Sequence, residues 1–137
     1  MFTSLHYYLA RSKLALLLWT RELQKRLSAE NSSIISLSLH PGTVHTEGLQ
    51  KYISQASGIR RLLTNLFSYF FLTPSQGAVA PTFAATAPIV RAEADKYKGS
   101  YLTETGNFNK VPATGKNDAL AKELCDTSEE LLKKIGV

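Results

Sequence analysis

The 137-residue sequence predicts an α/β fold, in which helices and strands follow one another along the chain and pack as layers. The first observation behind this prediction is the order of the hydrophobic patterns: helix, strand, helix, helix, strand, helix. The second is that only two segments have a strand pattern, whereas parallel sheets normally have several strands covered on both faces. The third is a first helix that is apolar on nearly every side. Together they predict one partial domain over residues 1–137, equivalent to the second half of a doubly wound parallel-sheet domain.

The first expected helix runs from Ser4 to about Ala29. Residues 14–19, with the sequence LALLLW, make it apolar around most of its circumference, and such a helix needs cover on all sides. Charged residues from Arg21 to Arg26 then give it one solvated side. Because two strands are too few to cover this helix, we expect its apolar surface to need a further partner.

Two short segments have the features of strands. The first is Ile34–Leu39, which follows a turn at residues 31–33 and alternates apolar residues with serines. It ends at Pro41 and Gly42, because proline cannot donate to a strand ladder and glycine permits a sharp turn. The second is Tyr101–Thr103. The alternating order of elements predicts that the two strands are parallel neighbours.

A further helix is expected from Thr73 toward Ala87. Thr73 can cap it, Pro74 suits its first position, and Gln76 completes a capping box. Pro81 should kink this helix or delay its regular part, because proline lacks the N–H group that an α-helix interior requires.

The last expected helix begins at Asn117 or Asp118 and ends at Gly136. One side of it carries an apolar stripe of Leu120, Leu124, Leu131 and Ile135.

Composition excludes several classes of protein. Lys and Arg outnumber Asp and Glu by 16 to 11, but they are scattered, so no nucleic-acid patch emerges. The single cysteine, Cys125, cannot form an internal disulfide, which favours a reducing, cytoplasmic location. No signal peptide is recognised, and the apolar run Leu62–Leu72 is shorter than the roughly 20 residues of a membrane span. The three histidines lack the spacing of a metal site.

Five motifs, in order, resemble those of the short-chain dehydrogenase/reductase family, and especially its retinol-dehydrogenase-like branch. Each motif is weak by itself, but together they cover nearly the whole chain. They are Tyr8 with Ser12-Lys13, the loop His40-Pro41-Gly42-Thr43-Val44-His45-Thr46, Ser75-Gln76-Gly77-Ala78, Gly99-Ser100-Tyr101, and the closing segment from Ala121 to Glu129.

The resemblance implies that Tyr8 and Lys13 are the catalytic pair. A phenol is a poor base at neutral pH, and a lysine ammonium nearby lowers the pKa of a phenol so that it can exchange a proton. The family places tyrosine and lysine four residues apart on one helix face, whereas Tyr8 and Lys13 are five apart. A one-residue π-bulge between them would restore the pairing. The other interpretation is that residues 1–10 depart from the family's sequence, in which case Leu9 holds the tyrosine's position.

The resemblance also assigns cofactor-binding roles for NADP or NAD. It implies that Lys13 holds the ribose, that Pro41 and Gly42 shape the loop, that the Val44 backbone meets the nicotinamide carboxamide, and that the Thr46 hydroxyl lies near it. The family's glycine-rich pyrophosphate turn, T-G-x-x-x-G-x-G, is not found in this sequence, so the nucleotide-binding half of the domain is expected to be absent.

Two functions therefore stay open. One is NAD(P)-dependent interconversion of alcohols and carbonyl compounds with a small lipophilic substrate, expected to be inactive in this chain alone. The other is a non-enzymatic protein that docks on an intact relative, or on a second copy, through the first helix. The basic and then apolar segment Arg60–Leu72 has three interpretations: a lid over substrate, a core-facing helix, or a helix on a membrane surface.

Overall fold

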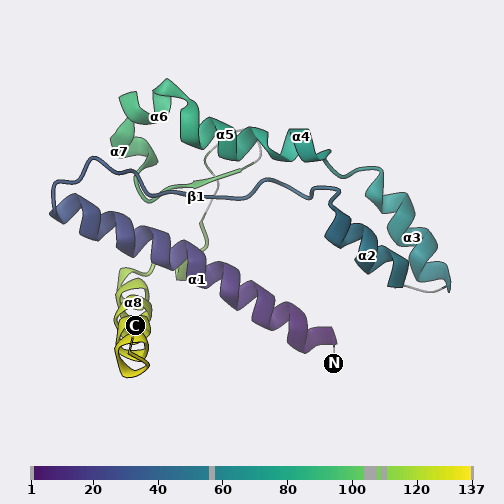
Figure 1. Ribbon diagram of the computed structural model, residues 1–137, viewed down its shortest axis with the longest axis horizontal. Helices are drawn as coiled ribbons and strands as arrows, with labels where there is room; N and C mark the ends of the chain where they lie inside the picture. Colours follow the sequence, from purple (N-terminus) through teal and green to yellow (C-terminus); the bar gives the residue numbers. More distant parts are fainter. Residues whose placement is uncertain (1, 56–57, 104–107, 109–110, 137) are drawn as a thin grey trace. The chain divides into compact units, whose positions relative to one another are not determined.

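The computed structural model describes residues 2–55, 58–103, 108 and 111–136, and it is mostly helical with one small sheet (Figure 1). Its elements are α1 (Phe2–Ala29), β1 (Ser38–Leu39), α2 (Glu47–Gln55), α3 (Gly58–Ser68), α4 (Pro74–Gly77), α5 (Val79–Thr86), α6 (Pro88–Ala92), α7 (Ala94–Tyr97), β2 (Tyr101–Leu102), the 3-10 helix η1 (Ala113–Lys116) and α8 (Asp118–Lys134). They form two compact units, of which the first holds α1, α6, α7, η1 and α8, and the second holds α2 to α5. None of the described helices is both long enough and apolar enough to pass through a bilayer.

The expected first helix is confirmed, and its end has a clear cause. Asn31 adopts a left-handed conformation with φ 55°, which asparagine tolerates better than most residues. This conformation lets the Ser32 N–H donate to the Leu27 carbonyl oxygen at 2.9 Å and close the last turn. The turn expected at residues 31–33 is therefore present.

The two strands are parallel neighbours, as expected, but the first is much shorter than predicted. Only Ser38–Leu39 forms a strand, where the sequence predicted Ile34–Leu39. The backbone N–H of Ser36 donates to Oε1 of the buried Gln24 at 2.6 Å, so a side chain of α1 occupies the donor that a strand neighbour would use. The expected burial of alternate residues is also absent, because residues 35–39 are all half-buried.

The helix expected from Thr73 is capped as predicted and then broken. The Gln76 N–H donates to Thr73 Oγ1 at 3.3 Å, and the Thr73 N–H donates to Gln76 Oε1 at 2.8 Å, which completes the capping box. The helix is interrupted at Ala78, between α4 and α5. Pro81 has no N–H to donate to the carbonyl of Gly77, so the interruption lies where the sequence predicted a kink.

The last helix begins where predicted, but its buried side is different. Asn117 caps α8, because its Oδ1 accepts from the Leu120 N–H at 3.1 Å. The buried residues are Ala121 and Cys125, whereas Leu131 and Ile135 of the expected stripe are exposed. Small residues let α8 approach α1 closely, and this packing rather than the leucine stripe decides which side is buried.

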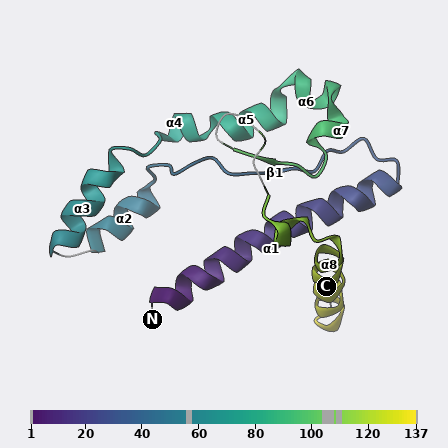
Figure 2. The ribbon, with the colours of Figure 1, turned by 180° about the vertical axis from the view of Figure 1, so that it is seen from behind.

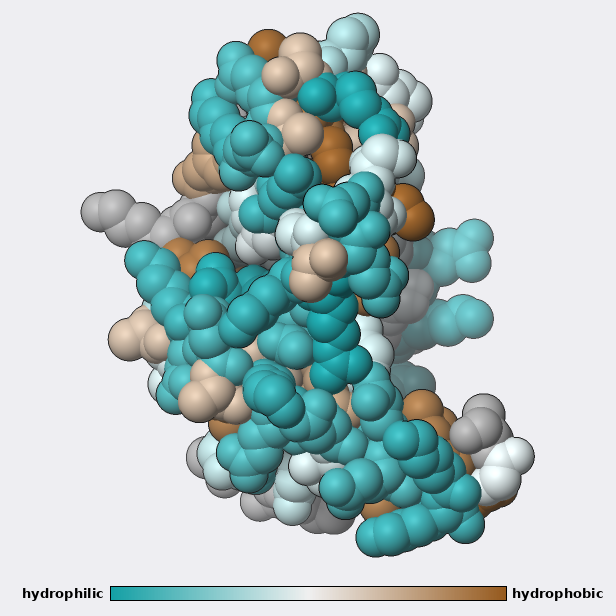
Figure 3. All heavy atoms as spheres, turned by 90° about the vertical axis from the view of Figure 1, so that its left-hand side faces the viewer, coloured by the Kyte–Doolittle hydropathy of each residue, from teal (hydrophilic) through white to brown (hydrophobic). Residues whose placement is uncertain are grey.

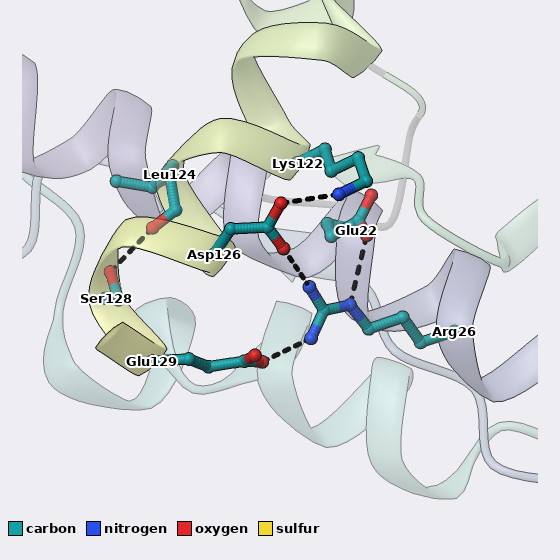
Figure 4. Close-up of polar contacts among 7 residues, drawn as sticks. All are labelled: Glu22, Arg26, Lys122, Leu124, Asp126, Ser128 and Glu129. Atoms are coloured by element: carbon teal, nitrogen blue, oxygen red, sulfur yellow. Dashed lines mark hydrogen bonds and ion pairs between the residues drawn. The ribbon is translucent and has the colours of Figure 1, made fainter. Parts of the chain in front are cut away.

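The helix α8 lies against the second half of α1 (Figures 1 and 2), and ion pairs join the two helices (Figure 4). The Arg26 guanidinium donates through Nε to Oε1 of the buried Glu22 at 3.0 Å and through Nη2 to Oδ1 of Asp126 at 3.1 Å, and it also pairs with Glu129. These carboxylates raise the pKa of Arg26, first through the Glu22 hydrogen bond. Lys122 pairs with Asp126 at the edge of the group, as Figure 4 shows.

The helices α2, α6 and α7 were not predicted. Proline explains two boundaries in this region, because Pro88 begins α6 and Ala87 before it is extended at ψ 123°. The buried apolar residues of the first unit come from α1, α6, α7, β2 and α8: Leu18, Val90, Tyr97, Leu102, Ala121 and Cys125. Burial raises the pKa of the Cys125 thiol, which keeps this cysteine neutral and unreactive.

Candidate functional site

One candidate segment lies on α1, in the first unit. This helix is α-helical from Phe2 to Ala29, with no π-helical turn between Tyr8 and Lys13. Five residues of α-helix turn through about 500°, so the two positions lie roughly 140° apart around the axis. The structure therefore does not contain the π-bulge that would bring Tyr8 and Lys13 to one face, and their catalytic pairing stays a prediction.

The neighbouring side chains of α1 make local contacts. The ring of Tyr8, which is 64% exposed, lies edge-on to the ring of Tyr7 with centroids 5.9 Å apart. Arg11 lies 5.3 Å from the centre of the Tyr7 ring and donates to its hydroxyl at 3.3 Å. The Ser12 hydroxyl donates to the Leu9 carbonyl oxygen at 2.8 Å, so it is directed back along the helix.

Leu9 lies four residues before Lys13, at the position where the family's helix carries its tyrosine. Both residues are exposed, and i, i+4 positions share a helix face. A phenol at position 9 would meet the ammonium of Lys13, whereas leucine has no proton to transfer. The interpretation that the first ten residues depart from the family's pattern stays a prediction.

A separate candidate segment is the loop that follows β1, in the second unit. Gly42 has φ 86°, a left-handed conformation that a residue with a Cβ adopts at a cost. Its N–H donates to Nδ1 of His40 at 3.0 Å, so the imidazole of His40 closes the turn around Pro41. The sharp turn that the sequence predicted at Pro41 and Gly42 is therefore present.

Val44 is held by Leu72 on one side of the loop. The two residues form a parallel bridge, in which the Leu72 N–H donates to the Thr43 carbonyl oxygen and the His45 N–H donates to the Leu72 carbonyl oxygen, both at 2.8 Å. In such a bridge the N–H and C=O groups of the central residue are directed away from the partner strand. The peptide groups of Val44 are thus presented on the opposite side, where a carboxamide could bind them.

Thr46 follows this bridge and begins α2. Its carbonyl oxygen accepts the N–H of Gln50 at 3.0 Å, which places Thr46 at the start of the helix. The first turn of a helix presents free N–H groups and a partial positive charge, a setting that suits an anionic ligand group. The cofactor roles of Pro41, Gly42, Val44 and Thr46 stay predictions.

The sequence analysis missed a shallow hollow beside this loop. It has a volume of about 450 Å³, within the range of small-molecule sites, and is lined by His45, Ser68, Tyr69, Phe71, Thr73 and Pro74. The bridge between Val44 and Leu72 assembles it from two segments some 25 residues apart. No periodic pattern reveals such a hollow, and only the capping signal at Thr73 pointed to one of its walls. Across the described part of the chain, no group of three His, Cys, Asp or Glu side chains could hold a metal ion.

Comparison with curated proteins identifies relatives over most of the chain. A short-chain dehydrogenase/reductase of Armillaria gallica is 33% identical over 96% of this chain and 40% of its own length. A short chain dehydrogenase/reductase of Macrophomina phaseolina is 35% identical over 93% of this chain and 60% of its own length. Retinol dehydrogenase 11 of the mouse is 36% identical over 88% of this chain and 34% of its own length.

The chain thus spans between about a third and three fifths of the length of these relatives. No family model matches it, and no solved structure matches it.

Proposed function

This chain is a homologue of the short-chain dehydrogenase/reductases, retinol dehydrogenases among them, and from this premise we propose that it forms part of an oxidoreductase that interconverts alcohols and carbonyl compounds with NADP or NAD. The cofactor supplies or accepts the hydride when bound. The proposal assigns to this chain the helix that carries Lys13 and the loop from Pro41 to Thr46. A small lipophilic alcohol or carbonyl compound is the proposed substrate.

The observation that carries the proposal is the geometry of Val44. Its N–H and C=O groups are directed away from the Leu72 bridge, and Gly42, two residues before it, adopts a left-handed conformation and carries no side chain. A carboxamide needs one donor and one acceptor in fixed positions, and a bridged backbone residue offers both. The hollow beside the loop would receive the lipophilic substrate, with Tyr69 and Phe71 as apolar walls.

The residues of this chain fit only one end of the cofactor. The glycine-rich turn that would hold the pyrophosphate is not part of this sequence, so full cofactor binding requires a nucleotide-binding part from further sequence or from another chain. In that setting Lys13 would orient the ribose and lower the pKa of a nearby phenol, which would exchange a proton with the substrate oxygen. A cytoplasmic location, which the single cysteine favours, stays part of this proposal.

A second candidate function is supported by the surface of α1. Among the residues of this helix whose burial the structure describes, several large apolar or aromatic side chains are exposed: Tyr7, Tyr8, Leu9, Leu16, Trp19 and Leu23. Exposed apolar side chains along one helix are typical of an interface. The chain would then act without catalysis, as an interaction protein that docks through α1 on an intact relative or on a second copy of itself.

The test is a hybrid protein in which residues 12–137 replace the matching part of mouse retinol dehydrogenase 11, so that the relative supplies the nucleotide-binding part and the catalytic tyrosine. We expect NADPH binding and reduction of a long-chain aldehyde, with turnover lost in Lys13→Met. A hybrid that folds but binds neither NADPH nor NADH would overturn the oxidoreductase proposal. If this hybrid also bound the intact relative, and Leu16→Gln abolished that binding, the interaction function would be favoured.

A further inference from the structure

The helix α3 separates apolar and polar positions more sharply than the other helices of its unit. With 100° between successive residues, positions 59, 62, 63 and 66 fall on one side of the helix, and these are Ile, Leu, Leu and Leu. Positions 60, 61, 64 and 68 fall on the other side, and these are Arg, Arg, Thr and Ser. The apolar positions therefore form a continuous stripe along α3, which is the pattern of a helix lying at a boundary between water and an apolar phase.

The apolar side of α3 is exposed. Ile59, Leu62 and Leu66 are 76%, 70% and 62% exposed. The two residues after the helix, Tyr69 and Phe70, are 90% and 84% exposed, so the stripe continues into an aromatic pair. Such exposure excludes a core-facing role for α3 in its own unit, one of the three interpretations that the sequence allowed. A contiguous apolar surface of this kind indicates a binding surface.

The charges around this surface indicate what it binds. From Glu47 to Leu72 the chain carries one acidic residue, Glu47, and three basic residues, Lys51, Arg60 and Arg61. Glu47 lies in the first turn of α2, where its charge is matched by the positive end of that helix. The segment therefore has an excess of positive charge beside its apolar stripe, and this combination is complementary to an anionic lipid surface.

We propose that α3 and the Tyr69-Phe70 pair form a docking surface for anionic phospholipid bilayers, with the apolar stripe at the depth of the acyl chains and the arginines at the headgroups. Tyrosine and phenylalanine suit the interfacial region of a bilayer, and arginine extends from an apolar surface to reach phosphate. The proposal does not depend on the oxidoreductase function.

The first unit has a hydrophilic face that contrasts with the apolar surface of α3. The face seen in Figure 3, on the side of α6 and α7, is covered mainly by hydrophilic side chains, with apolar atoms in small separate groups. The first unit also contains ion pairs such as Lys96 with Glu93 and Lys98 with Asp95. A hydrophilic face is solvated and has no preference for lipid, so we expect the face in Figure 3 to contribute nothing to bilayer binding.

The experiment measures sedimentation of the 137-residue chain with vesicles of phosphatidylcholine and phosphatidylserine, and with vesicles of phosphatidylcholine alone. We expect binding to the mixed vesicles that weakens as salt is added. Leu62→Gln with Leu66→Gln should reduce binding on the order of tenfold or more, because it removes two exposed side chains that would enter the lipid. Arg60→Gln with Arg61→Gln should reduce binding only to the anionic vesicles.

The matched control is Leu131→Gln on α8, whose side chain is 56% exposed and should not affect vesicle binding. A second measurement places a tryptophan in the surface, Phe70→Trp combined with Trp19→Phe, and we expect its emission to shift to shorter wavelength with anionic vesicles. Equal losses for Leu131→Gln and the Leu62/Leu66 variant, or an unchanged emission, would overturn the proposal. So would a dimer in the absence of lipid that the Leu62/Leu66 variant dissociates, because the stripe would then bind a second copy.

Discussion

The side chain of Val44 lies directly on the backbone of Gly77, so closely that a Cβ at residue 77 would be 2.4 Å from Cγ2 of Val44. This contact holds the Val44 side chain, and with it the loop, against the end of α4. Valine cannot withdraw easily, because its branched side chain has one strongly preferred rotamer in most settings. The glycine is thus required by close packing rather than by its backbone angle.

Replacement of Gly77 by alanine should therefore destabilise the second unit by about 1–3 kcal/mol, the usual cost of overpacking. Urea unfolding measures the loss, and the amides of His45 and Leu72 should exchange faster, since both belong to the bridge. Gly48→Ala is the matched control, because its Cβ would meet only Thr46 Oγ1 at 3.9 Å. Val44→Ala should relieve the clash in a double-mutant cycle, and additive effects would show that the two residues are not coupled.

The Arg26 ion pairs give a second prediction. Arg26→Gln should lower the urea midpoint of the chain, because the buried carboxylate of Glu22 would lose its hydrogen-bonded cation. The double variant Arg26→Gln with Glu22→Gln should recover part of the loss, since it removes the buried charge. Lys25→Gln, at the exposed neighbouring position, serves as control. An equal change for Lys25→Gln and Arg26→Gln would contradict a specific role for the cluster.

The pH dependence of stability gives a third prediction. The hydrogen bond from Lys122 lowers the pKa of Asp126 below its ordinary value of 3.8. The ionised Asp126 carboxylate therefore adds to the free energy of unfolding. This contribution is fully present above pH 3.8 and is lost as the pH falls through the lower pKa that Asp126 has in the folded state. The Lys122→Gln variant should be less stable than the parent at neutral pH. Its free energy of unfolding should also fall less than the parent's when the pH is lowered. Lys116→Gln should keep the parent's pH profile, and a parallel profile for Lys122→Gln would refute the assignment.

The purified 137-residue chain should bind NADPH only weakly. The pyrophosphate turn is not part of this sequence, and a few hydrogen bonds from the loop contribute about 0.5–1.5 kcal/mol each. Titration followed by NADPH fluorescence gives the dissociation constant. Saturation at micromolar concentration would contradict this expectation and would mean that the chain forms a complete nucleotide site.

The fifth prediction concerns Leu9 and Lys13, in a longer protein where a nucleotide-binding half precedes this unchanged chain. Turnover should be very low, because leucine holds the position four residues before Lys13. Leu9→Tyr should raise turnover of a generic carbonyl substrate by roughly 10²–10⁴-fold, the usual value of a positioned general acid or base. Tyr8→Phe should then change little. High activity of the unchanged protein, abolished by Tyr8→Phe, would instead establish Tyr8 as the catalytic residue.

The sequence by itself determined the elements whose signals are local. The end of α1 at Asn31, the capping box at Thr73, the interruption before Pro81 and the cap at Asn117 each depend on backbone groups within four residues, so the residue types specify them. The family relationship was also predictable, because motifs in a fixed order remain visible without a structure.

Only the tertiary structure decided the features that depend on distant partners. The strand predicted at Ile34–Leu39 has only two residues because the Ser36 N–H donates to the side chain of Gln24, twelve positions earlier, instead of to a strand neighbour. The buried side of α8 follows from the close approach of α1 rather than from the leucine stripe, and the hollow beside Val44 exists because Leu72 pairs with it. In each case a hydrogen bond or packing contact between remote residues competes with the local preference and is strong enough to override it, and sequence periodicity carries no information on such contacts.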